Sequence, residues 1–183
     1  MMNPYELIED YYRPGSKAHA ILVRHSEQVA EKAVAIAERV RHLQPDIPFI
    51  HEAALLHDIG IVYTRASKIG CHGAHRYVAH GYLGRLEMDK RGFPRHALVC
   101  ERHVGVGITA EEIRRYRLPL PARDMLPVSL EEKIVCFADK FYSKDSASGG
   151  EEKTLAQVIA SLLPFGQDKA DRFQEWAEFF DYR

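Results

Sequence analysis

The sequence lacks any long run of hydrophobic residues. Even its longest apolar stretches are short pieces such as Ala53 to Leu56, whereas a helix that crosses a bilayer needs about 18 consecutive apolar residues. The N-terminus also lacks the basic region and apolar core of a secretory signal. We therefore expect a cytoplasmic protein with no membrane-spanning segment and no membrane partner.

An excess of charge of either sign is also missing. Lys and Arg number 25 and Asp and Glu 26 among 183 residues, a formal net charge of -1. Such a chain offers no field that gathers nucleic acid, so no nucleic-acid partner is expected. Its 46% hydrophobic and 28% charged residues are typical of a folded globular protein. The length predicts a single domain over residues 1–183.

Cysteine is scarce, whereas histidine is abundant. Cys71, Cys100 and Cys136 are odd in number and widely spaced, which excludes a disulfide framework and a thiolate zinc site. The chain contains ten histidines. Any metal chemistry is therefore expected to rest on histidine.

No segment shows the alternation of a β-strand, and we predict an all-α fold, an irregular helical bundle. Apolar residues recur at steps of three or four over residues 18–43 and again up to Gly60, as in amphipathic helices. Gly60 is interpreted as the stop of the second helix. Further helices are predicted over 75–90 and 94–104, from Thr109, from Ser129, and near 151–163 and 168–181.

Two segments lack helical periodicity. Residues 63–73 predict a loop or a poorly formed helix that could cover a site, and residues 145–150 predict a surface loop. In the predicted helix over 75–90, Gly81 and Gly84 leave room for the close approach of another backbone.

Histidine and aspartate side chains fall on separate predicted helices or at helix ends. Imidazole nitrogens and carboxylate oxygens together suit iron, manganese, cobalt, nickel or zinc better than magnesium. Taken singly, a histidine on an apolar stripe is more often a hydrogen-bonded core residue. A carboxylate at the edge of a buried face needs either a metal or a salt bridge. The candidates are His25, His57, Asp58, His80, His103 and Asp139.

Three segments carry a resemblance to a known family. They are Arg24-His25-Ser26, Leu55-Leu56-His57-Asp58-Ile59-Gly60 and Phe137-Ala138-Asp139-Lys140. The chain resembles the HD superfamily of metal-dependent phosphohydrolases, whose signature runs His, then His-Asp, then a late Asp on a helix. The resemblance implies an HD-type core over about residues 18–145. The C-terminal helices over about 151–182 are not part of the resemblance, and we expect them simply to pack on that core.

The resemblance also implies a dinuclear centre. One divalent transition metal (Fe, Mn, Co, Ni or Zn) would be bound by His25, His57, Asp58 and Asp139. A second would be bound by Asp58, His80 and His103, with Asp58 as the bridging, catalytic residue. A water activated by the metals would then cleave a phosphoester or phosphoanhydride of a small phosphorylated substrate, such as a nucleotide.

Basic residues close in sequence to the proposed ligands are candidates for binding phosphate, although residues in such positions are more commonly solvated or paired with neighbouring acids. They are Arg24, Arg102, Lys133 and Lys140.

Many two-metal relatives, including the cyclic-dinucleotide phosphodiesterases, have Lys directly after His-Asp-Xaa-Gly, where this chain has Ile61. The symmetrical diadenosine tetraphosphate hydrolases are more similar in size.

Two other functions remain open at this point. Some HD proteins use the same ligands in a di-iron oxygenase, and a third interpretation is a non-catalytic domain that binds metal or nucleotide. A complete set of six ligands favours catalysis, because four suffice for a structural metal. The sequence gives no indication of oligomeric state.

Overall fold

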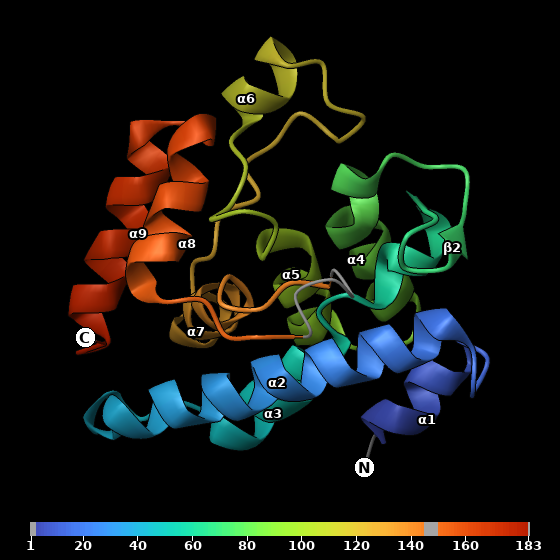
Figure 1. The fold of residues 1–183 in the computed structure, drawn as a ribbon, viewed down its shortest axis with the longest axis horizontal. Coiled ribbons are helices and arrows are strands. Elements are labelled where there is room, and N and C mark those ends of the chain that lie inside the picture. The colour runs from blue at the N-terminus through green and yellow to red at the C-terminus, as the bar shows by residue number, and fades with distance from the viewer. Residues whose placement is uncertain (1–2, 145–149, 183) are drawn as a thin grey trace.

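The computed structural model describes residues 3–144 and 150–182, and it is mainly helical (Figure 1). The all-α expectation is confirmed. None of the described helices combines the length and the apolar character that crossing a membrane requires. The helices are α1 (Pro4–Glu9), α2 (Lys17–Arg39), α3 (Ile47–Leu56), α4 (His80–Lys90), α5 (Pro94–Arg102), α6 (Ala110–Arg115), α7 (Leu130–Asp139), α8 (Leu155–Leu162) and α9 (Gln167–Phe179).

The long helix α2 packs against α3 and α7 and runs along the lower edge of the molecule in Figure 1. The Ser16 hydroxyl accepts a hydrogen bond from the backbone N–H of His19 and so caps the first turn. Its buried stripe includes Leu22, Val29 and Ile36, as the periodicity predicted. The predicted end at residue 43 is one turn too late, because the chain tightens there into the 3-10 helix η1 (Arg41–Leu43).

The C-terminal helices share the hydrophobic core of α7. The rings of Phe137 and Phe173 stack with centroids 4.4 Å apart, and Phe180 meets Phe137 edge-on at 5.3 Å. All three side chains are fully buried, so α9 is packed on the helix that ends at Asp139. The assignment of residues 1–183 to one domain stays a prediction.

Gly60 has a different role from the predicted one. Helix α3 ends before it, at Leu56, and Gly60 lies inside the 3-10 helix η2 (Ile59–Tyr63). A Cβ atom at Gly60 would lie 2.2 Å from the carbonyl oxygen of His80 and 2.3 Å from the amide nitrogen of Gly84. Gly60 therefore permits close contact with α4 and does not terminate a helix.

The segment predicted as a loop over residues 63–73 contains a short antiparallel hairpin. Strand β1 (Arg65–Ala66) pairs with β2 (Cys71–His72), with Arg65 opposite His72. Strands of two residues are too short to show alternation in the sequence, so the expectation of no strand was wrong here.

The start of one further helix also differs from the sequence prediction. The helix expected over 75–90 begins with a 3-10 turn, η3 (Tyr77–Ala79), and is α-helical only from His80.

Helix α1 was not predicted. The buried Tyr12, just beyond α1, donates its hydroxyl hydrogen to the carbonyl oxygen of Ile59 at 2.9 Å and accepts from the N–H of Val62 at 2.8 Å. It thereby fixes η2. Most of the loop predicted over 145–150 lies outside the described residues.

Candidate metal centre

Three histidines are held in the same way. Each follows a helical segment, and its Nδ1 lies 2.6 to 2.7 Å from the backbone carbonyl oxygen three residues earlier. A carbonyl oxygen can only accept, so Nδ1 carries a proton and Nε2 is the atom left to bind a metal. Such a backbone acceptor orients a metal-binding imidazole. The three are His57, His80 and His103.

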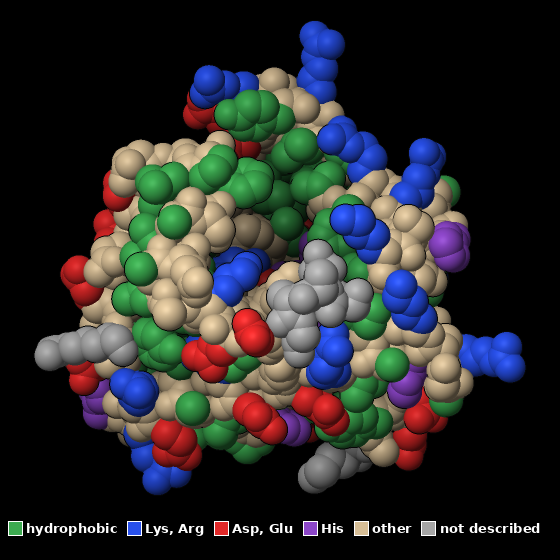
Figure 2. All heavy atoms as spheres, viewed as in Figure 1, with side chains coloured by type: hydrophobic (Ala, Val, Ile, Leu, Met, Phe, Trp, Pro, Cys, Tyr) green, Lys and Arg blue, Asp and Glu red, His purple; other side chains and the backbone are tan. Residues whose placement is uncertain are grey.

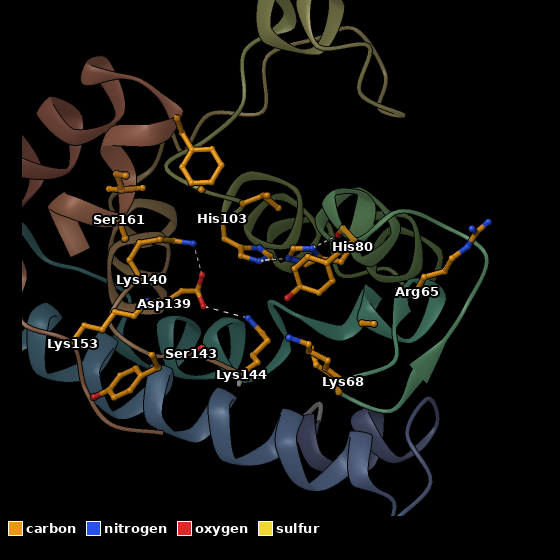
Figure 3. A pocket seen from close by; sticks show the side chains of 18 of the residues that line it. Arg65, Lys68, His80, His103, Asp139, Lys140, Ser143, Lys144, Lys153 and Ser161 are labelled. Carbon is orange, nitrogen blue, oxygen red and sulfur yellow. Dashed lines mark hydrogen bonds and ion pairs between the residues drawn. The ribbon is translucent and has the colours of Figure 1, made fainter. Parts of the chain in front are cut away.

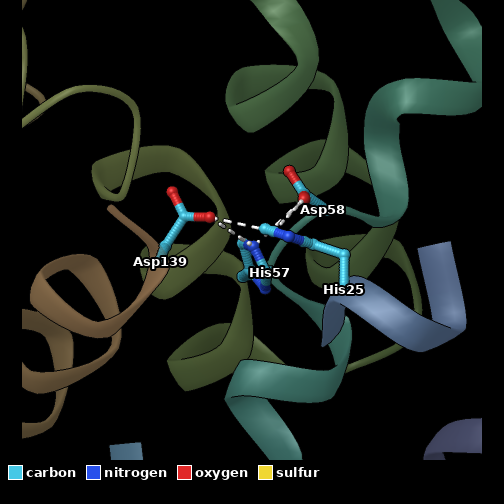
Figure 4. Close-up of side chains that lie close together, drawn as sticks. All are labelled: His25, His57, Asp58 and Asp139. Carbon is cyan, nitrogen blue, oxygen red and sulfur yellow. Dashed lines mark hydrogen bonds and ion pairs between the residues drawn. The ribbon is translucent and has the colours of Figure 1, made fainter. Parts of the chain in front are cut away.

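A first group of buried side chains comes from α2, the end of α3 and the end of α7 (Figure 4). It consists of His25, His57, Asp58 and Asp139, each with an atom suited to metal binding within 4.8 Å of the others. The Nε2 of His25 lies 2.9 Å from Oδ1 of Asp139 and 3.3 Å from Oδ2 of Asp58. The Nε2 of His57 lies 3.1 Å from that same Asp58 oxygen.

A second group shares Asp58 with the first and adds His80 and His103. Here the other carboxylate oxygen, Oδ1, faces the imidazoles, at 3.3 Å from Nε2 of His80 and 3.4 Å from Nε2 of His103. The two Nε2 atoms lie only 3.0 Å apart. Asp58 thus presents one oxygen to each pair of histidines.

The unsatisfied atoms in these groups fit a metal. Among the described residues, Nε2 of His57 and Oδ1 of Asp58 are buried without a hydrogen-bond partner. Buried polar atoms without partners are costly, and the lone pairs of two neutral imidazole nitrogens at 3.0 Å repel unless a cation or proton lies between them. Nitrogen and carboxylate ligands suit divalent transition metals. The clustered residues therefore indicate divalent metal binding.

A cavity of about 670 Å³ opens over the cluster, with Asp139, His80 and His103 in its wall (Figure 3). The Nζ atom of Lys144 lies 2.6 Å from Oδ2 of Asp58 and 3.7 Å from Oδ1 of Asp139. The Nζ atom of Lys140 lies 2.5 Å from the other oxygen of Asp139. The positively charged lining residues are Arg65, Lys68, Lys140, Lys144 and Lys153.

Of the four basic residues proposed for phosphate, the structure brings only Lys140 to this cavity. Arg24 is exposed on α2, and Lys133 is half-buried on α7 outside the lining. Arg102 donates to both carboxylate oxygens of Glu132, at 2.8 and 2.9 Å. These three side chains miss the cavity because successive residues of a helix point about 100° apart. A residue next to a proposed ligand in the sequence therefore need not point in the same direction as that ligand.

Four basic residues of the cavity wall were not predicted from the sequence, namely Arg65, Lys68, Lys144 and Lys153. Arg65 and Lys68 belong to the hairpin segment, which the sequence predicted only as a loop or poorly formed helix that could cover a site. Lys144 follows α7 by one turn. The feature of the sequence that could have indicated these residues is the presence of lysine and arginine in the segments next to the helices that carry the proposed ligands.

Burial and neighbouring charge shift the pKa values of the histidines in opposite directions. Burial alone would lower the pKa of His57, but the carboxylates of Asp58 and Asp139 outweigh it and raise that pKa to about 9. Burial lowers the pKa of His80 to about 3, helped by His103 and Lys144 and opposed by Asp58. Without a metal, His57 therefore carries a second ring proton at neutral pH, whereas His80 does not.

Metal binding should accordingly release a proton from His57. At pH 7.5 we expect release of about one proton per chain, and little at pH 10, where His57 is already neutral. Apparent metal affinity should rise about tenfold per pH unit below 9 and then level off. Calorimetric titration in buffers of different ionisation enthalpy measures the number of protons released on metal binding. Equal proton release at both pH values would contradict the prediction.

The same shifts govern the stability of the metal-free protein. Because the pKa of His57 is raised in the fold, its contribution is complete below its ordinary value of 6.5 and is lost as pH rises through about 9. The lowered pKa of His80 acts in the opposite sense and destabilises the fold as pH falls from 6.5 towards 3.

The fold and this cluster define an HD domain. Residues 22–143 match the family model described as HD domain, and the chain belongs to that family. An uncharacterized protein of Methanocaldococcus jannaschii is 39% identical over 121 residues, which cover 64% of each chain.

Two further relatives are tRNA (cytidine(56)-2'-O)-methyltransferases. The protein from Thermoplasma volcanium is 30% identical over 86% of this chain, and the protein from Picrophilus torridus is 33% identical over 70% of it. The matches span 41% and 33% of those two proteins, so the chain corresponds to less than two thirds of each of these relatives, as it does of the M. jannaschii protein (64%).

Solved structures show the same fold. The HD domain of the L. monocytogenes phosphodiesterase PgpH, in complex with cyclic-di-AMP, superposes with a TM-score of 0.55 over 98% of this chain and 85% of that one. The sequence identity is 12%. A second crystal structure of the same domain gives a TM-score of 0.54 over 98% of this chain and 86% of that one.

Proposed function

We propose that this chain is a dinuclear metal-dependent phosphohydrolase that cleaves a phosphoester or phosphoanhydride of a small molecule. The observation that carries the proposal is the placement of Asp58, whose two oxygens face two separate pairs of histidines. A carboxylate so placed suits a bridge between two cations, one held with Asp139 and one held by His80 and His103.

The chemistry follows from the charges around this bridge. When bound, divalent cations lower the pKa of a water and polarise a phosphoryl oxygen. The protein side chains position the partners. Asp58 and Asp139 supply ligand charge, while Lys140 and Lys144, whose Nζ atoms already contact these carboxylates, would neutralise phosphate oxygens in the cavity.

The proposal names a class of substrate, small phosphorylated molecules. The neighbour PgpH is described in complex with cyclic-di-AMP, which favours a nucleotide or another phosphorylated metabolite. The cyclic dinucleotide itself is disfavoured for this chain, because Ile61 is fully buried in an apolar cluster where many two-metal relatives have a lysine. The proposal likewise does not include the methyltransferase activity of the archaeal relatives, most of whose length lies outside the match.

The test is metal content and phosphate release in the parent and in a His80→Ala, His103→Ala double variant. We expect two metals per chain in the parent, about one in the variant, and loss of most phosphate release. His51→Ala, on α3 and exposed, is the control and should leave both values unchanged. One metal in both proteins would contradict the dinuclear assignment. Dioxygen uptake without phosphate release by the iron-loaded parent would favour the oxygenase.

A further inference from the structure

A second chamber adjoins the cavity over the metal cluster. It has a volume of about 550 Å³, in the range that suits an organic ligand. Figure 2 shows the hollow in the centre of this face, with hydrophobic side chains around its upper rim and Lys or Arg side chains within and beside it. The two chambers are neighbours, because their walls share Tyr77, His80, Val104, Gly105, Leu162 and Phe165.

The two chambers differ in chemistry. The first is lined by five basic residues, whereas the second is lined mainly by apolar ones, among them Ile108, Leu118 and Pro164. The charged side chains in the second are Glu112 and Lys169, and they pair with each other, with Nζ 2.7 Å from Oε1. The pair is neutral as a whole, so the second chamber does not attract charge.

The rim of this chamber is unusually exposed for an apolar surface. Phe165 is 73% exposed and Tyr116 56% exposed, and both line the chamber. Phe165 also lines the cationic cavity, so it lies where the two chambers adjoin. Aromatic side chains left exposed beside an apolar hollow are typical of a ligand-binding site.

We propose that the second chamber binds the organic group of the substrate, and that this group is bulky, uncharged and apolar. The inference rests on the proposed function, because it places the phosphate in the cationic cavity at Asp58 and Asp139. A substrate anchored there reaches the second chamber past Tyr77 and Phe165, which belong to both walls. The protein would then select phosphate esters with a large apolar group over small polar ones.

The experiment compares 1-naphthylphosphonate with methylphosphonate, two anions that share the phosphonate head and resist hydrolysis. Binding to the metal-loaded protein is measured by calorimetry. We expect the naphthyl compound to bind roughly thirty-fold more tightly, from the apolar area that it buries. Phe165→Ala and Tyr116→Ala should each reduce this ratio about threefold to fivefold. Leu163→Ala is the matched control, since Leu163 is 47% exposed beside Phe165 but lines neither chamber.

The outcomes separate this inference from the function on which it rests. Failure of both phosphonates to bind would overturn the proposed phosphate site and the inference with it. Equal affinity for the two compounds would overturn the inference alone. If Phe165→Ala changed the sedimentation of the protein but not the ratio, the apolar rim would be a contact between copies of the chain, and the inference would again be wrong.

Discussion

Replacement of Asp58 by Asn is expected to reduce phosphate release by about 10³-fold or more, and to remove most bound metal. The side chain is fully buried and lies within 3.4 Å of four histidine Nε2 atoms. Asn retains the shape but supplies no charge, and only its amide oxygen can ligate a cation, because its NH₂ group cannot. One proposed metal site therefore loses a ligand through this substitution, and both sites lose the negative charge that they share.

The comparison with Asp139→Asn makes this prediction specific. Asp139 belongs to the first group alone, so its replacement should lower the metal content by about one per chain, whereas Asp58→Asn should affect both metals. Asp10→Asn serves as the control, since Asp10 is 54% exposed and pairs with Arg91 on the surface. Metal analysis, a phosphate-release assay and far-UV circular dichroism provide the readouts. More than a tenth of parental activity in Asp58→Asn would contradict the assignment.

The helices that carry the site were largely predictable, since burial of one helical face leaves a periodic trace in the sequence. The stripe of α2 placed His25 among apolar residues, and the structure indeed buries it. Side-chain direction at helix ends leaves no such trace. His57, His80 and His103 are aimed by carbonyl oxygens three residues earlier, a local geometry that periodicity does not encode.

The ligand roles came from the family resemblance and not from spacing. His57 and His103 lie far apart in the chain, yet their ring centroids are 4.8 Å apart. Contacts of this separation depend on how α3 and α5 pack, which a single sequence does not specify. Lys144 was missed for the same reason, since nothing in the sequence predicts that the turn after α7 directs its ammonium group to Asp58.

The substitution Gly60→Ala is expected to lower the free energy of unfolding by at least about 3 kcal/mol, the upper part of the range for overpacking. The added Cβ would meet backbone atoms of His80 and Gly84 at 2.2 and 2.3 Å. These atoms belong to α4, and a helix backbone cannot yield as a flexible side chain does. Helix α4 must therefore move as a unit, and α5 packs against it.

This movement should also affect the candidate metal centre. Asp58 lies two residues before Gly60, and His80 begins α4, so separation of the two segments would lengthen the 3.3 Å contact between Asp58 Oδ1 and His80 Nε2. We expect the variant to lose the metal held by Asp58, His80 and His103 before the one held with Asp139. Urea unfolding and metal analysis measure the two effects.

Gly92→Ala separates steric overlap from backbone strain. Gly92 has a φ of +80°, and a Cβ atom added there would meet no other atom within 4 Å. Alanine at this position therefore costs only the strain of the left-handed conformation, about 1–2 kcal/mol, and the metal content should equal that of the parent. If Gly60→Ala unfolded at the same urea concentration as the parent and retained both metals, close packing of α4 on η2 would not be what holds Asp58 against His80.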